Sequence, residues 1–425
     1  MSIHSPKLPP LGIFRHKAFA QFWAVRFIAV LGLQMQAVAI GWQVYDLARR
    51  TMGIKESAFL LGFIGLAQFV PLFFLSLIGG QTADRFDRKK IIIIFFGVEV
   101  LLSAILGTTI LMPTQSALFA IFSVAAGFGI VRAFLPPAMS ALAPSLVPKE
   151  ELPQAIAWNS LAFQGASVLG PACGGLLYIL GPQAVYLTCL ILQIVAILIL
   201  IITQTPKQDL NLNRQNMFQL IKEGVNFVWN NKIVLGAISL DLAVVLLAGA
   251  TALLPVFAKD ILHQGPQALG VLRASTAVGA AIIALFLAIN PIRERVGLYM
   301  FIAVIIFGVA TFGFGISRNF YLSAFWLMVA GGADMISVYV RQSLIQIATP
   351  DEMRGRVTAV SMIFISASNE MGEFESGMLA RLIGPVNAVV FGGIGAIMVS
   401  GLWMKLFPQL RDANKFLDAS PQNKL

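Results

Sequence analysis

Ionisable side chains interrupt the long apolar segments of this 425-residue sequence, and they are the first candidates for chemistry. An unpaired charge in a hydrocarbon environment costs roughly 3 kcal/mol or more, so such a residue is either functional or paired. The alternative for each residue is a structural role: its charge is paired, or its side chain extends to the lipid headgroups, and it only fixes helix packing. The charged residues inside apolar segments are Arg26, Glu99, Arg132, Asp241, Arg273, Asp334, Glu370, Glu373 and Glu375.

The carboxylates of this set are candidates for carrying a proton. Burial disfavours the charged form of a carboxylate and a neighbouring cation favours it, so a change of surroundings can load or release a proton. Asp241 is the first candidate because no basic residue lies within one helical turn of it in the sequence. Glu370 and Glu373 come next, and Asp334 and Glu99 complete the proton-coupling candidates.

Enzymatic chemistry has little support in this sequence. No nucleotide-binding loop of the form G-x-x-x-x-G-K-[ST] occurs, and His4, His16 and His263 all lie in tails or loops. Cys173 and Cys189 both fall inside apolar segments, without the spacing of a disulfide framework or a metal site. We therefore expect no catalytic residue, no metal and no cofactor.

The composition indicates a multi-pass membrane protein, since 58% of the residues are hydrophobic, 12% are charged and the mean hydropathy is +0.82. The net charge of +10 does not predict nucleic-acid binding, because the basic residues are scattered through short loops. Most of the 30 Lys and Arg residues lie in loops on one side, which the positive-inside bias makes the cytoplasmic side. Both chain termini are therefore predicted to be cytoplasmic.

A helix needs about 20 apolar residues to cross a bilayer, and twelve runs of that kind are present. They begin near Ala18, Ser57, Ile91, Ala117, Gln154, Ala184, Ile233, Gln267, Val296, Tyr321, Val357 and Pro385. We expect an all-α membrane protein with an amino-terminal six-helix bundle (1–203), a cytoplasmic linker (204–232) and a carboxyl-terminal six-helix bundle with a short tail (233–425).

The linker contains one amphipathic piece. Apolar residues recur at helical spacing beside Lys222 and Glu223, and they are Met217, Leu220, Ile221, Val225 and Val228. This pattern predicts a helix lying at the lipid headgroups, or alternatively a solvated linker helix.

The segment from Gly80 to Lys90 joins two apolar runs and carries six charges within seven residues, so it is a tight cytoplasmic loop. Its spacing of Gly, three residues, Asp-Arg, two residues and Arg-Lys resembles the loop between the second and third helices of the major facilitator superfamily. Asp87 stands where that family usually has Gly. The resemblance implies a cytoplasmic latch made of Gly80, Asp84, Arg85, Arg88 and Lys89.

An internal repeat supports two related bundles. A shift of 202 residues lays Gly129 on Gly331, and it lays the run 170–175 on 372–377. The first of these runs contains Gly170, Pro171, Gly174 and Gly175 and resembles a fifth-helix motif of proton antiporters in the superfamily. Read from the residues alone, its small side chains permit close helix approach, and its proline bends the helix.

Three stretches resemble the bacterial exporter branch of the superfamily, which includes the enterobactin exporter, and they are 34–46, 239–242 and 369–377. In the superfamily the first, fourth, seventh and tenth spans line the cavity. The resemblance therefore implies that polar residues of the first span contact substrate, by hydrogen bonds or stacking. These substrate candidates are Arg26, Gln34, Gln36, Trp42 and Gln43. The alternative is hydrogen bonding between packed helices.

Four charges lie toward the cytoplasmic ends of cavity-lining spans, with cations in the first half and anions in the second: Arg26, Arg132, Asp241 and Asp334. One hypothesis is that they attract across the halves and close the cytoplasmic mouth. The alternative is pairing within each half, for example of Arg26 with Glu99, which lie at similar depths.

The resemblance predicts a monomeric secondary transporter in the bacterial inner membrane. It would export a small drug-like or siderophore-like molecule by proton antiport and alternating access. The alternatives are an uptake permease or uniporter of the same fold, and a non-transporting membrane sensor or assembly protein.

Overall fold

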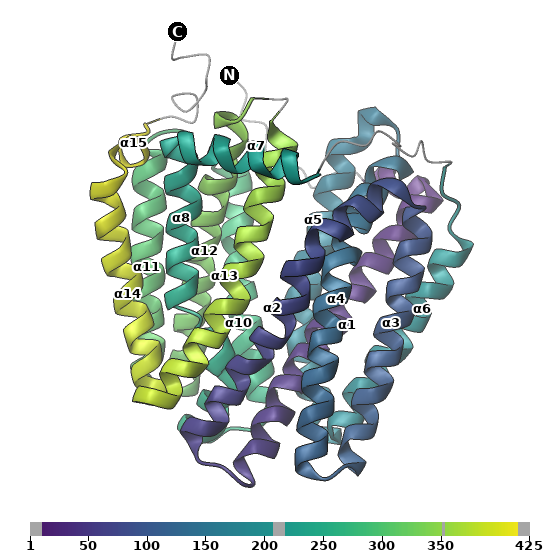
Figure 1. The fold of residues 1–425 in the computed structure, drawn as a ribbon, viewed down its shortest axis with the longest axis vertical. Helices are drawn as coiled ribbons and strands as arrows, with labels where there is room; N and C mark the ends of the chain where they lie inside the picture. Colours follow the sequence, from purple (N-terminus) through teal and green to yellow (C-terminus); the bar gives the residue numbers. More distant parts are fainter. Residues whose placement is uncertain (1–10, 207–216, 351–352, 415–425) are drawn as a thin grey trace. The chain divides into compact units, whose positions relative to one another are not determined.

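The structure is a computed structural model that describes residues 11–206, 217–350 and 353–414 (Figure 1). Within these ranges the chain forms helices and no strands. The first six long helices are α1 (Lys17–Arg49), α2 (Ile54–Arg85), α3 (Arg88–Thr108), α4 (Thr114–Leu142), α5 (Leu152–Leu177) and α6 (Pro182–Ile202). The remaining helices are α7 (Met217–Asn230), α8 (Lys232–Leu247), α9 (Leu254–Val256), α10 (Pro266–Ile289), α11 (Val296–Ile316), α12 (Phe320–Ala348), α13 (Arg354–Ile383), α14 (Pro385–Leu406) and α15 (Pro408–Arg411).

Eleven of the described helical segments are long and apolar enough to cross a membrane. The helix α13 spans 30 residues, but Asn369, Glu370, Glu373 and Glu375 make it the most polar of the long helices. It coincides with the predicted run that begins near Val357. The predicted all-α membrane fold is thus confirmed, while the cytoplasmic position of the two termini stays a prediction.

Contacts divide the chain into two compact units. Unit 1 contains Met1–Gly53, Leu66–Asn213 and Ala258–Ala274, and unit 2 contains Ile54–Gly65, Arg214–Phe257 and Ser275–Leu425. The helices α2 and α10 therefore each contribute residues to both units. The division of the sequence at 1–203, 204–232 and 233–425 stays a prediction about domain organisation.

The internal repeat is visible inside each unit. In unit 1, Gly129 of α4 lies against the backbone carbonyl of Gln68 in α2. In unit 2, Gly331 of α12 lies against the backbone carbonyl of Thr276 in α10. A Cβ atom at either glycine would collide with that carbonyl oxygen, so the glycine permits the helix backbones to meet. The two glycines related by the 202-residue shift thus each permit a close helix contact, although their partners lie 208 residues apart.

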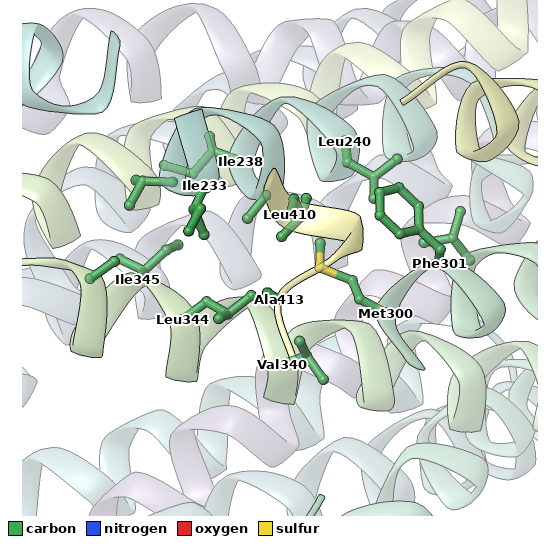
Figure 2. Packing of buried hydrophobic residues seen from close by; sticks show 14 of the residues in the cluster. Ile233, Ile238, Leu240, Met300, Phe301, Val340, Leu344, Ile345, Leu410 and Ala413 are labelled. Carbon is green, nitrogen blue, oxygen red and sulfur yellow. The ribbon is translucent and has the colours of Figure 1, made fainter. Parts of the chain in front are cut away.

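One end of unit 2 is closed by the segment after α14. Figure 2 shows Leu410 and Ala413, on the yellow carboxyl-terminal segment, among buried side chains of α8, α11 and α12. The backbone N–H of Gly297 donates to the Ala413 carbonyl at 3.1 Å, and the absence of a side chain at Gly297 leaves room for the Leu410 carbonyl. The ring of Phe407 packs against Gly236 of α8. These contacts make residues 407–413 part of the core of unit 2.

The helix α7 matches the amphipathic piece predicted in the linker. Val228 is buried in the core of unit 2, whereas Val225 and Trp229 are exposed. The Glu223 carboxylate pairs with the Arg356 guanidinium of α13 at 2.5 Å. The helix is therefore attached along one side to unit 2, and its expected place at the lipid headgroups stays a prediction.

Candidate functional site

A buried ion pair lies in the interior of unit 2. The Asp241 carboxylate of α8 pairs with the Arg341 guanidinium of α12, and the side chains are only 8% and 4% exposed. The hydroxyl of Ser361 on α13 lines the same small cavity and is buried without a hydrogen-bond partner. Removing one member of a buried pair leaves the other charge without compensation, so loss of either residue is expected to destabilise unit 2.

Arg341 was missed by the sequence reasoning. A span of about 20 residues that begins near Tyr321 ends just before Arg341, which puts this arginine in a cytoplasmic loop. The helix α12 instead runs for 29 residues, to Ala348. The signal was the continued helical spacing of apolar residues after Arg341, at Leu344, Ile345 and Ala348.

The carboxylates of α13 lie at a close contact with the first part of α2, inside unit 2. Glu370 is 4% exposed, and a Cβ atom at Gly65 would lie 2.8 Å from the Glu370 carbonyl oxygen and 2.9 Å from the Glu373 Cβ. The Glu375 Oε2 atom is buried without a hydrogen-bond partner. This helix therefore brings several acidic groups to a tightly packed site.

The four charges of the hypothesised cytoplasmic gate have the following surroundings. Asp241 pairs with Arg341 inside unit 2, and Asp334 is exposed on α12. Arg132 donates from Nη1 to Gln68 Oε1 of α2 at 3.0 Å inside unit 1. Arg26 lies in unit 1 as well. Attraction between the two sets stays a prediction.

Arg26 and Glu99 do not pair in this structure, so the alternative of an ion pair between them is wrong. Glu99 is 4% exposed, its Oε2 atom has no hydrogen-bond partner, and its carboxylate lies near the Cys189 thiol of α6. Arg26 instead lines a cavity with Asn159 of α5. The two side chains face different helices, whereas the sequence predicted only that they lie at similar depths.

The glutamines of the first span belong to the packed interior of unit 1. Gln36 donates to the Ser103 hydroxyl of α3 at 3.1 Å. Gln43 donates to the Thr109 hydroxyl at 2.9 Å and accepts a hydrogen bond from the Tyr186 hydroxyl of α6 at 2.5 Å. These contacts correspond to the alternative of hydrogen bonding between packed helices.

The other two substrate candidates of α1 also have close neighbours. Gln34 packs with its Cβ against Gly170 of α5. Trp42 is 7% exposed, and the Lys259 ammonium lies 6.0 Å from the centre of its ring. Substrate contact by Gln34 and Trp42 stays a prediction.

A charged cluster joins the end of α1 to the one-turn π-helix Phe257–Ile261, whose residues from Ala258 onward belong to unit 1 as α1 does. The Asp46 carboxylate pairs with the Lys259 ammonium at 2.5 Å. The Asp260 carboxylate pairs with Arg49 at 3.3 Å and accepts a hydrogen bond from the Tyr45 hydroxyl. The sequence analysis assigned no role to these residues. Both segments contain acidic and basic residues, and both lie at predicted outer ends of spans.

The charged loop between α2 and α3 is anchored to helix ends of unit 1. Asp87 caps α3, because its side chain accepts hydrogen bonds from the backbone N–H groups of Lys89 and Lys90. Arg88 donates to the Ala141 carbonyl of α4 at 2.9 Å. Lys89 donates to the Thr203 carbonyl after α6 at 2.7 Å.

Cations at carbonyl groups near helix ends are favourable, so Arg88 and Lys89 brace the unit in this conformation. Asp84 and Arg85, at the end of α2, are exposed. Gly80 also lies on α2. A latch function for this loop stays a prediction.

The glycines of α5 permit close helix contacts in unit 1. A Cβ atom at Gly174 would lie 2.8 Å from the backbone of Met35 in α1, and one at Gly170 would lie 3.0 Å from the Leu31 carbonyl. A Cβ atom at Gly175 would lie 2.9 Å from the Cα atom of Gly270 in α10. These distances agree with a packing role for the motif that includes Pro171. Among the described residues, no group of three or more His, Cys, Asp or Glu side chains is arranged to hold a metal ion.

Comparison with known proteins gives one family over nearly the whole chain. Residues 8–425 match the model of the family described as "Transmembrane secretion effector", one of the major facilitator superfamily. The enterobactin exporter of Citrobacter koseri is 27% identical over 400 residues, which cover 93% of each chain. The enterobactin exporter of Escherichia coli O81 is 27% identical over 411 residues, which cover 96% of this chain and 95% of the relative.

Solved structures share the fold at low sequence identity. A D-xylose-proton symporter superposes with a TM-score of 0.71 at 13% identity, over 92% of this chain and 98% of the other. A POT family transporter in complex with a thioalcohol-conjugated peptide superposes with a TM-score of 0.72 at 11% identity, over 93% and 96%.

Proposed function

Because the chain belongs to the transmembrane secretion effector family of the major facilitator superfamily, we propose that it exports a small organic molecule across the bacterial inner membrane. The proposal is supported by enterobactin exporters that align with 93% or more of the chain. The family is one of transporters and not of enzymes. We further propose that the monomer works by alternating access and that protons moving inward drive export.

The observation that carries proton coupling is the buried pair of Asp241 and Arg341. A carboxylate that binds a proton loses its attraction for the guanidinium, so protonation weakens the contact between α8 and α12. Reformation of the pair expels the proton. A group that exchanges a proton for an ion-pair partner in this way links proton binding to a change of helix packing.

The acidic residues of α13 are the second candidates for the proton. Glu370 and Glu373 lie where the helix meets the glycines of α2, so a change of charge there acts on a tight helix contact. Asp334 and Glu99 are further candidates for carrying the proton and rank below these residues. The Asp241 pair ranks first because its switching partner is identified.

The charged cluster around Asp46 and Asp260 is proposed to hold the outer end of unit 1 closed. It joins two segments that are far apart in the sequence through several charged contacts. The loop around Asp84 is proposed to act at the opposite, cytoplasmic end. Opening and closing of the two ends in alternation would then move the substrate.

Transport of enterobactin into proteoliposomes tests this function. The full-length protein is reconstituted, a pH gradient is imposed so that protons leave the vesicles as substrate enters, and accumulated enterobactin is measured. We expect accumulation that a protonophore abolishes and that Asp241→Asn reduces at least tenfold. The control Asp412→Asn removes an exposed carboxylate after α15 and should transport normally.

Two outcomes would contradict the proposal. Gradient-independent equilibration in the wild-type protein would favour a uniporter. Full coupling in Asp241→Asn, and also in the Glu370→Gln/Glu373→Gln variant, would exclude the proposed proton carriers. If enterobactin is not moved, other siderophore-like and drug-like molecules serve as substrates in the same assay.

A further inference from the structure

A cavity of unit 1 that is open on one side contains a cation and no counter-ion. It lies where α1, the end of α4 and the start of α5 meet, and its volume is about 250 Å³. Arg26 is the only charged residue among the described residues that line it. Asn159, Ser140 and Ser160 supply the polar part of the wall, and the rest is apolar.

Two polar groups in this wall have no hydrogen-bond partner. The Nε atom of Arg26 and the Oδ1 atom of Asn159 are both buried and unpartnered, and Asn159 is only 7% exposed. A buried donor or acceptor without a partner is costly. The cavity therefore offers strong donors from the guanidinium and one free acceptor from the amide.

We propose that this cavity binds an anionic group that has a hydroxyl nearby, as found in aromatic and aliphatic hydroxy acids. The guanidinium and the serine hydroxyls donate to the anionic oxygens, and Asn159 Oδ1 accepts from the hydroxyl of the ligand. The inference rests on the proposed function, because it makes the cavity a binding site for one part of the exported molecule.

The size of the cavity limits what enters. Pockets that enclose a whole small-molecule ligand measure about 300–1,000 Å³, so this one holds a single ring-sized group of a larger molecule. The apolar wall, which includes Leu152 and Ile156, suits the flat face of an aromatic ring. A cation is disfavoured because Arg26 already supplies a positive charge that nothing in the wall neutralises.

Binding of small aromatic probes to the purified full-length protein tests the proposal. The probes are 3-hydroxybenzoate, benzoate and the neutral 3-hydroxybenzamide, titrated by calorimetry in lipid-free detergent. We expect 3-hydroxybenzoate to bind at least tenfold more tightly than the neutral amide, with benzoate between the two. Arg26→Gln should remove the preference for the anion.

A second variant guards against a folding defect in Arg26→Gln. Asn159→Asp keeps the size of the side chain and gives Arg26 a counter-ion, so it should fold well yet lose at least tenfold in affinity for 3-hydroxybenzoate. The matched control Arg293→Gln removes an exposed arginine from the loop between α10 and α11 and should bind as the wild type does.

Three results would overturn the proposal: equal binding of the anion and the amide, an anion preference that survives in both variants, and no binding at millimolar concentrations. Stabilisation by phosphatidylglycerol that depends on Arg26, without an effect of 3-hydroxybenzoate, would assign the cavity to lipid headgroups and also overturn it. The assay involves no transport, so its outcome is independent of whether export is observed.

Discussion

The two units differ in the partners of their most deeply enclosed charged groups. In unit 2, Asp241 has Arg341 as its partner, and both are almost completely enclosed. In unit 1, the buried Glu99 Oε2 and Arg26 Nε atoms have no hydrogen-bond partner. Neutralising one member of an ion pair weakens the contact between the helices that the pair joins. A charged group without a partner can instead be compensated by a bound ligand of opposite charge. In the proposals above, unit 2 accordingly contains the proton-dependent switch and unit 1 the site for a charged ligand.

The glycine contacts show what the two units share. Gly175 of α5 meets Gly270 of α10 in unit 1, and Gly377 of α13 meets Gly62 of α2 in unit 2. A Cβ atom at Gly175 would lie 2.9 Å from the Gly270 Cα atom, and one at Gly377 would lie 2.7 Å from the Gly62 Cα atom. The same backbone geometry thus occurs with and without acidic neighbours, so close packing does not explain the carboxylates of α13.

The largest expected effect comes from breaking the pair in unit 2. Arg341→Gln leaves the Asp241 carboxylate buried without its cation, and we expect a loss of about 3–5 kcal/mol in stability. The double variant with Asp241→Asn should recover most of the loss, because it contains no unpaired charge. Thermal unfolding in detergent provides the comparison. A double variant as unstable as Arg341→Gln would show that the pair is not the relevant interaction.

The shared glycine geometry predicts a loss of stability that is similar in the two units and smaller than the loss expected for Arg341→Gln. Gly175→Ala and Gly377→Ala each place a methyl group against backbone atoms of the facing helix, which should destabilise by about 1–3 kcal/mol. The matched control is Gly97→Ala in α3, where a Cβ atom would meet nothing within 4 Å. This control should be neutral or slightly stabilising. Normal stability of both test variants would contradict the close contacts.

A charge swap tests whether the two units also attract each other. If Arg132 and Asp334 form part of a cytoplasmic gate, Arg132→Asp and Asp334→Arg should each slow transport by about tenfold, which corresponds to about 1.4 kcal/mol. The double swap should transport several-fold faster than either single variant. Transport by the double swap no faster than by either single variant would exclude the gate and leave Arg132 with its partner Gln68.

The smallest effect is expected at Glu99. Glu99→Gln replaces a buried carboxyl group whose Oε2 atom has no hydrogen-bond partner, so stability should change by less than about 1 kcal/mol or increase slightly. The same unfolding assay compares it with Asp241→Asn, which strands Arg341 and should be clearly destabilising. A large loss of stability in Glu99→Gln would mean that this carboxylate has an essential partner.

The sequence predicts the elements of the fold well because each depends on local composition. Runs of apolar residues predict the long helices, and the glycines of α5 predict close helix contacts, both of which the structure contains. The family resemblance rested on short motifs and is confirmed by a match over residues 8–425. Of the long helices in the described part of the chain, α13 alone falls outside a simple hydropathy criterion, because its acidic residues lower its average.

The site was harder to predict because pairing depends on helix rotation. Arg26 and Glu99 lie at similar depths, yet they face different helices. Asp241 has a partner from α12 that is 100 residues away in the sequence, and sequence spacing carries no information about such a contact. Gln36 and Gln43 fit substrate binding and helix packing equally well until their partners are known.

The packing of residues 407–413 into the core of unit 2 has a consequence for how the protein is made. The helix α8 leaves the ribosome long before Phe407 and Leu410, which cover its side near Gly236. At a synthesis rate of about 5–20 residues per second, that apolar surface waits on the order of 10 s for its cover. We therefore expect α8 to enter the membrane before its core is complete, with time for a chaperone or the translocation machinery to hold it.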